Sequence, residues 1–133
     1  MSFLGKEYVL VSHNHFNDFL KAYGLPDDVI QEYLSSKAST KVQQSGDQYT
    51  AIYNDADGTK EVSFKSGVEF DDVLGREKTP VKATYVVDGN TLTQTIKTDK
   101  GSLVSKGEYN GNDLVVTLTS DTFSNVAKLF YKA

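Results

Sequence analysis

Cysteine is absent from this sequence of 133 residues, and no long apolar run occurs in it. Without cysteine, the chain can form neither a disulfide nor a thiolate metal site. No segment approaches the roughly 18 consecutive apolar residues that a membrane-spanning helix requires. The opening residues, MSFLGKEY, also lack the apolar stretch of a signal peptide, so we expect a cytoplasmic protein.

Concentrated charge of one sign is missing as well. The chain has 14 basic and 18 acidic residues, which give a net charge of −4 without a block of like charge or a basic stripe. Proteins that bind nucleic acid usually carry such a stripe, so we expect no nucleic-acid partner. The length fits one domain, residues 1–133, which is large enough to bury a core. We expect that domain to be a monomer.

Two segments early in the chain show helical periodicity. Residues 14–24, NHFNDFLKAYG, and residues 26–37, PDDVIQEYLSSK, each place apolar side chains at i, i+3 or i+4 spacing. Asn14 is a candidate N-cap and Gly24 a candidate stop for the first helix. Pro26 suits the first position of the second helix. The sequence therefore predicts a tight helix–turn–helix.

The remaining chain alternates with a period of two between turn signals. A strand at residues 7–12 precedes the helices, and from Ser39 onward turn signals recur about every 8–12 residues. The clearest is Asp88-Gly89, which predicts a hairpin. About ten strands would leave long edges in one flat sheet. We therefore predict an all-β protein with two short helices: an antiparallel β-barrel of ten strands with a cavity, covered by the helices.

Three stretches of the sequence resemble the intracellular lipid-binding proteins, also called fatty-acid-binding proteins. The first is an N-terminal signature formed by Tyr8, Leu10, His15-Phe16 and Phe19-Leu20, with Asn17 where the family usually has an acidic residue. The second is VSFKSGVEFDDV at residues 62–73, which is similar to the family's Phe-x-x-Gly-x-x-Phe stretch. The third is GNDLVVTLTS at residues 111–120. The middle and end of the chain are most similar to insect members.

The resemblance implies a flattened barrel whose helices cover a portal and whose cavity holds a hydrophobic ligand. The family carries long-chain fatty acids, retinoids, bile salts or similar molecules through the cytosol. Many members bind the ligand carboxylate with an Arg-x-Tyr pair in the last strand and with a second arginine in an earlier strand. The expected partner is thus a fatty acid or another hydrophobic small molecule.

The last strand, NVAKLFYKA, offers two alignments for the Arg-x-Tyr pair. One alignment places Lys128 and Phe130 at the pair, and the other places Leu129 and Tyr131 there. An inward lysine would cost several kcal/mol of desolvation unless it were paired, whereas an inward leucine costs nothing. This argument favours Leu129 and Tyr131 as the inward residues and leaves the alternative with Lys128 open.

The position of the second arginine falls on Gly107, and alternation places the neighbouring charges of Lys106 and Glu108 on the outer face. We therefore expect neither of the family's inner arginines. Burial of a long chain contributes about 0.8 kcal/mol per methylene, and a charge-assisted head-group bond adds only about 1.5–3 kcal/mol. Lipid binding should thus persist with weaker preference for a carboxylate, and a neutral head group becomes possible.

The remaining candidate residues follow from alternation and from the resemblance. The expected ligand-binding residues are Tyr131, Leu129, Thr40, Tyr53, Phe16, Leu20, Ile96, Ser105, Val116 and Leu118. The expected portal comprises Val29, Ile30, Tyr33, Asp57 and Arg76. Each of these side chains could instead serve packing or an ordinary structural hydrogen bond.

Other functions find weaker support. A barrel enzyme acting on a hydrophobic substrate is the alternative, but the sequence has no cysteine nucleophile and no Gly-x-Ser-x-Gly motif. His13 and His15 have no third metal ligand in evidence, and NDADGTKE at residues 54–61 lacks the full calcium-loop pattern. We expect no cofactor. Acidic residues surround Lys21 and Lys37, so membrane contact should be transient at most.

Overall fold

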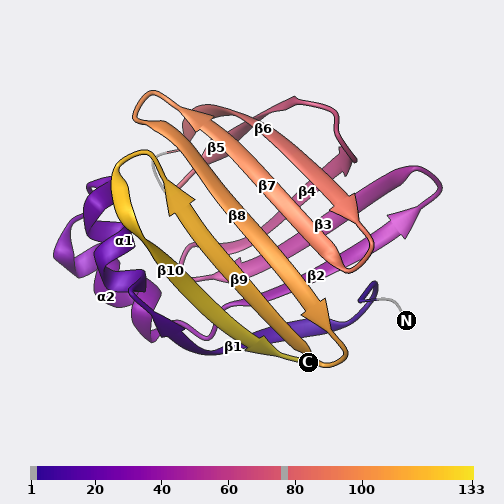
Figure 1. The fold of residues 1–133 in the computed structure, drawn as a ribbon, viewed down its shortest axis with the longest axis horizontal. Helices are drawn as coiled ribbons and strands as arrows, with labels where there is room; N and C mark the ends of the chain where they lie inside the picture. The colour runs from indigo at the N-terminus through magenta and orange to yellow at the C-terminus, as the bar shows by residue number, and fades with distance from the viewer. Residues whose placement is uncertain (1–2, 76–77) are drawn as a thin grey trace.

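The computed structural model describes residues 3–75 and 78–133, which form ten strands and two helices (Figure 1). The helices are α1 (Phe16–Tyr23) and α2 (Asp27–Ser35). The strands are β1 (Glu7–Asn14), β2 (Ser39–Ser45), β3 (Gln48–Asp55), β4 (Gly58–Lys65), β5 (Phe70–Leu74), β6 (Thr79–Asp88), β7 (Thr91–Thr98), β8 (Gly101–Asn110), β9 (Asp113–Ser120) and β10 (Phe123–Lys132).

All ten strands belong to one antiparallel sheet with the order β4-β3-β2-β1-β10-β9-β8-β7-β6-β5. The sheet curls into a flattened barrel, with β6–β10 crossing in front of β1–β4 and the helices covering one end (Figure 1). The first and last strands pair in its centre, where Leu10 lies opposite Tyr131. The two edges are β4 and β5, and no strand pairing joins them within the described residues. The predicted fold class is confirmed.

Short hairpins connect most strands, as the turn signals predicted. The β6–β7 hairpin shows the local reason, because its loop residue Gly89 has φ +60°. Residues with a β-carbon rarely adopt that backbone conformation, whereas glycine does so without strain. Asp88 pairs with Thr91, so the loop is Gly89–Asn90 and not the predicted Asp88–Gly89. The turn is shifted by one residue, since Asp88 still belongs to the strand.

The helices begin and end close to the predicted positions. The N-cap of α1 is His15, with φ +59°, and not Asn14, which is the last residue of β1. Gly24 ends α1 with φ +104°, and its N–H donates to the carbonyls of Leu20 and Lys21. The N-cap of α2 is Pro26, one residue before the position predicted for it. Asp27 and Asp28 follow it, in the turn where the helix dipole stabilises negative charge.

Apolar side chains gather in two clusters. The first surrounds the buried side chains of Phe3, Tyr8, Phe64, Tyr85 and Leu114 inside the sheet. The second joins the helices to β10 through Phe19, Leu20, Ile30 and Ala127. Full burial of side chains of this size stabilises a fold by about 1.5–3 kcal/mol each. The helix pair is thus fixed to the barrel by its apolar stripes.

Candidate functional site

The inner face of the barrel is only partly filled by side chains. Several residues that alternate with outward-facing neighbours pack against the two clusters and yet keep accessible surface, among them Tyr53, Ile96, Val116, Leu118 and Tyr131. The diameter of a β-barrel grows with the number of its strands, and eight strands are already enough to enclose one small ligand. The accessible surface of these residues therefore faces an internal space.

The last strand turns its apolar face inward and its lysine outward. Ala127 and Leu129 are buried, with 0% and 7% of their surface exposed, whereas Lys128 is exposed. Leu129 lies opposite Val116 of β9, and Tyr131 packs against the first cluster. This is the register that the desolvation cost of Lys128 favours.

Strand β8 likewise turns a small residue, Gly107, inward. Gly107 is buried between the exposed Lys106 and Glu108. A β-carbon at Gly107 would lie 3.3 Å from the side chain of Leu114, tighter than ordinary van der Waals contact. The packing around Gly107 is therefore closed to a larger side chain unless Leu114 moves.

Polar side chains form a row across the inner face of four neighbouring strands. Strand pairing places Tyr8, Thr40, Tyr53 and Lys60 directly opposite one another on β1, β2, β3 and β4. Directly paired residues share a face of the sheet, and Tyr8 is buried. The hydroxyls predicted at Thr40 and Tyr53 therefore belong to one inner row, which ends at a lysine.

A second polar row lies on the opposite wall, where Tyr85, Gln94 and Ser105 are paired across β6, β7 and β8. The two rows meet inside the barrel, because the Gln94 amide donates a hydrogen bond to the Tyr53 hydroxyl. The Tyr85 hydroxyl also lies close enough to Tyr53 to affect its pKa. The interior thus contains a cluster of neutral hydrogen-bonding groups, Tyr53, Tyr85 and Gln94.

Burial keeps the tyrosine hydroxyls of the interior protonated. Burial and the charge of Asp72 raise the pKa of Tyr85 to about 12. Burial, with a smaller effect of Asp55, raises the pKa of Tyr131 to about 12 as well. The pKa of Tyr53 lies well above its ordinary value, mainly because the group is buried. At neutral pH these groups can donate and accept hydrogen bonds but carry no charge.

The sequence matches a model of the lipocalin / cytosolic fatty-acid binding protein family over residues 1–128. The chain belongs to this family. It is 50% identical to fatty acid-binding protein 2 of the moth Manduca sexta over the full length of both chains. The crystal structure of the fatty-acid-binding protein isolated from Manduca sexta superposes with a TM-score of 0.93 and covers 99% of this chain and 100% of its own, at 50% identity.

A second solved structure extends this family comparison. The fatty acid-binding protein from brain tissue of Drosophila melanogaster is 32% identical, with a TM-score of 0.89, and covers 99% of this chain and 100% of its own. The predicted resemblance to insect members of the family is confirmed.

The remaining candidate ligand-binding residues of this family member are divided between the two ends of the interior. Phe16 and Leu20 of α1 and Leu118 of β9 belong to the second cluster, where the helices pack on the barrel. Ile96 and Val116 pack against the first cluster. Ser105 is half-buried in the second polar row, opposite Leu118. All of them lie on the inner face or where the helices pack on the barrel, and their contact with a ligand stays a prediction.

The residues predicted for the portal occupy different environments. Ile30 is completely buried in the second cluster and therefore packs the helix onto the barrel. Val29 is half-buried. The Tyr33 hydroxyl of α2 donates a hydrogen bond to the carboxylate of Asp57 in the β3–β4 turn, which ties the helix to the rim of the barrel. Arg76 lies outside the described residues.

The sequence did not predict four polar residues that face the interior: Lys60, Asp72, Tyr85 and Gln94. Alternation could have placed Lys60, because it shares one face of β4 with the buried Val62 and Phe64. The contact of Gln94 with Tyr53 joins strands that are not neighbours in the sheet. No local pattern in the sequence reports such a contact across the barrel.

A half-open cleft of about 490 Å³ lies at the end of the barrel opposite the helices. It is lined by the N-terminal segment and by two hairpin turns, and its residues include Phe3, Leu4, Gln44, Tyr49 and Val87. This cleft is not the predicted portal.

Neither a metal site nor a membrane-spanning helix is evident in the described parts of the chain. No group of three or more His, Asp or Glu side chains there is arranged to hold a metal ion. Neither helix in residues 3–75 is long and apolar enough to cross a membrane.

Proposed function

We propose that this protein is a carrier that binds a long-chain fatty acid or a similar hydrophobic lipid inside its barrel. Relatives that share half of its sequence over their full length are named fatty acid-binding proteins. The internal space between the two apolar clusters supports the proposal, because ligand sites of this kind are mostly apolar with a few convergent polar groups.

The single observation that carries the head-group part of the proposal is the pair Leu129 and Gly107. Both positions face inward. The alignment that the sequence favours equates them with the two positions at which the resemblance implies an arginine in many family members. The carboxylate of a fatty acid therefore has no arginine to bind at residues 107 and 129. The hydroxyls of Tyr131, Tyr53 and Thr40 are the groups that would hold the head group instead.

This replacement weakens one part of the binding energy and leaves the larger part intact. A dozen methylenes at about 0.8 kcal/mol each contribute more than one charge-assisted hydrogen bond of about 1.5–3 kcal/mol. A neutral head group, such as an alcohol, ester or amide, loses nothing from the missing charge. The protein should therefore bind fatty acids and neutral lipids with similar affinity.

Transport and not catalysis is the activity that the interior supports. Catalysis on a lipid would need a nucleophile beside a base, or an acid–base pair with a pKa near neutrality. The chain has no cysteine, and both histidines lie at the start of α1 or just before it. The tyrosines of the interior have raised pKa values, so they stay protonated at neutral pH and are not available as bases.

Exchange of the lipid is proposed to pass between α2 and the β3–β4 turn, where Val29, Tyr33 and Asp57 lie near the rim. Asp27 and Asp28 in the first turn of α2 should repel an anionic membrane, so contact with donor membranes would be brief. The protein is expected to act as a cytoplasmic monomer.

The first test is the identity of the bound lipid. Native mass spectrometry of the purified protein should show about one lipid per chain, and solvent extraction should release a long-chain molecule. A delipidated sample should bind a fluorescent lipid probe and release it to competing lipids. A protein that neither retains a lipid nor binds any probe would contradict the proposed function.

A further inference from the structure

One lysine of the described chain lies on the inner face of a strand, at the gap between the two sheet edges, where 42% of its side chain stays exposed. Lys60 of β4 approaches both carboxylate oxygens of Asp72 on β5 at 3.2 Å. It also donates to the carbonyl oxygen of Val73 at 2.7 Å. Both hydrogen bonds of Lys60 thus go to the other edge strand, β5.

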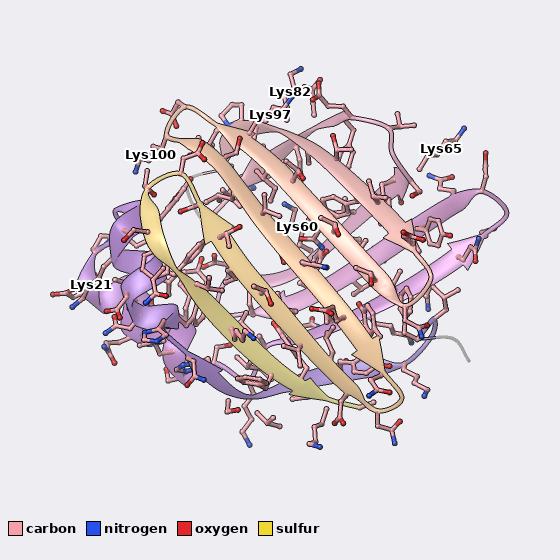
Figure 2. All side chains as sticks on the ribbon, viewed as in Figure 1. Lys21, Lys60, Lys65, Lys82, Lys97 and Lys100 are labelled. Atoms are coloured by element: carbon pink, nitrogen blue, oxygen red, sulfur yellow. The ribbon has the colours of Figure 1, made fainter. Side chains whose placement is uncertain are left out.

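Both members of the pair face inward. Lys60 alternates with the exposed Thr59 and Glu61, and Asp72 alternates with the exposed Asp71 and Val73. Only 14% of the Asp72 side chain is exposed. The labelled Lys60 lies within the outline of the barrel, whereas the other labelled lysines lie near its margin (Figure 2).

Lys60 is the one lysine of the described chain that shares a strand face with buried residues. It ends the row that contains Thr40 and Tyr53, so its charge lies beside the hydroxyls assigned to the head group. Asp72 also lies near Tyr85 of the neighbouring strand β6, since its charge contributes to the raised pKa of Tyr85. Lys60 and Asp72 therefore form a direct ion pair on the inner face of the described strands.

We propose that Asp72 determines the head-group specificity of the cavity by neutralising Lys60, the cation that would otherwise bind a ligand carboxylate. This inference rests on the proposed lipid-carrier function. With the pair intact, a carboxylate that approaches Lys60 also meets the negative charge of Asp72, and the two effects oppose each other. A neutral head group avoids this repulsion and can accept or donate hydrogen bonds at the tyrosines. The pair thus makes the cavity tolerant of uncharged lipids.

Asp72→Asn tests the proposal, with a saturated fatty acid and the primary alcohol of the same chain length as probes. The measured quantity is the ratio of the two dissociation constants, obtained by displacement of a fluorescent lipid. The variant should shift this ratio toward the fatty acid by about tenfold, the equivalent of about 1.4 kcal/mol, because Lys60 becomes available to the carboxylate.

Asp71→Asn is the matched control. Asp71 is the preceding residue of the same strand, 81% of its side chain is exposed, and it pairs with Lys82 on the outer face. This variant makes the same change in net charge without altering the interior. The ratio should stay within about twofold of the wild-type value, because exposed charges are screened by solvent.

Two further variants separate specificity from stability. Lys60→Met leaves the carboxylate of Asp72 without its partner and should shift the ratio toward the alcohol. Adding Lys60→Gln to Asp72→Asn should abolish the shift toward the fatty acid. If Asp72→Asn does not fold, the Lys60→Met ratio decides the question, since a purely structural role would weaken both ligands equally.

An unchanged ratio in Asp72→Asn, or an equal shift in the double variant, would overturn the proposal while the wild-type protein still binds lipid. Failure of the wild-type protein to bind either probe would overturn the proposed function itself, and the specificity inference with it.

Discussion

Leu129 and Lys128 are adjacent residues with opposite environments, and the difference follows from the pleat of one strand. The apolar side chain is buried against Val116, and the lysine is in water. A shift of one residue in the β10 register would exchange them and bury an ammonium group, at a cost of several kcal/mol. The pattern of Ala127, Leu129 and Tyr131 therefore fixes the register and, with it, the chemistry that the last strand offers a ligand.

Leu129→Arg should restore a charged anchor at this position. We expect the affinity for a fatty acid, relative to the matching alcohol, to rise about tenfold, since the new guanidinium would lie near Tyr131. Competition with a fluorescent lipid measures the ratio. Lys128→Leu is the control, and its ratio should be unchanged because Lys128 is outside. Loss of fatty-acid affinity in Lys128→Leu would show that the register is wrong.

At the scale of elements, the turns and helices were the most predictable part of the fold. Glycine and aspartate mark the hairpins, and apolar stripes mark α1 and α2, because both signals arise from neighbouring residues. The errors were local as well: the α1 cap lies at His15, and the β6–β7 loop begins at Gly89.

The contacts across the interior were not predictable in the same way. Lys60 and Asp72 lie on the two strands that do not pair, so no register relates them. Gln94 reaches Tyr53 from the opposite wall. The faces of such residues can be predicted from alternation, but their partners depend on how far the sheet curls. This is why the sequence predicted Thr40, Tyr53 and Tyr131 and missed the groups around them.

Helix α2 is joined to the rim of the barrel by the bond from Tyr33 to Asp57. Tyr33→Phe removes that bond and keeps the aromatic packing. A hydrogen bond of this kind contributes about 0.5–1.5 kcal/mol, so lipid dissociation should become about two- to tenfold faster if α2 moves during release. Stopped-flow transfer of a fluorescent lipid to vesicles measures this rate. An unchanged rate would place the exit route elsewhere.

For the whole molecule, burial of the tyrosine hydroxyls links stability to alkaline pH. Tyr85 and Tyr131 have folded-state pKa values of about 12, above the ordinary value of 10.0 that the unfolded chain should have. Below pH 10 both states keep these protons, and the stabilisation is complete. Above it the unfolded state loses them first, so the free energy of unfolding falls as pH rises toward 12.

We therefore expect urea unfolding to show a loss on the order of 2 kcal/mol per buried tyrosine across this interval. Tyrosinate absorbance of the native protein should show a fraction of the eight tyrosines titrating late. Tyr131→Phe is the control and should lose less stability over the same range. A single titration of all tyrosines near pH 10 would contradict the burial of these hydroxyls.

The central pairing of β1 with β10 also has a consequence for biosynthesis. Leu10 meets Tyr131, so the sheet remains in two halves until the ribosome has made and released the last strand. The half that contains β1 would meanwhile expose a bare strand edge, which is a template for aggregation. Productive folding should therefore be post-translational and slow for a chain of this size.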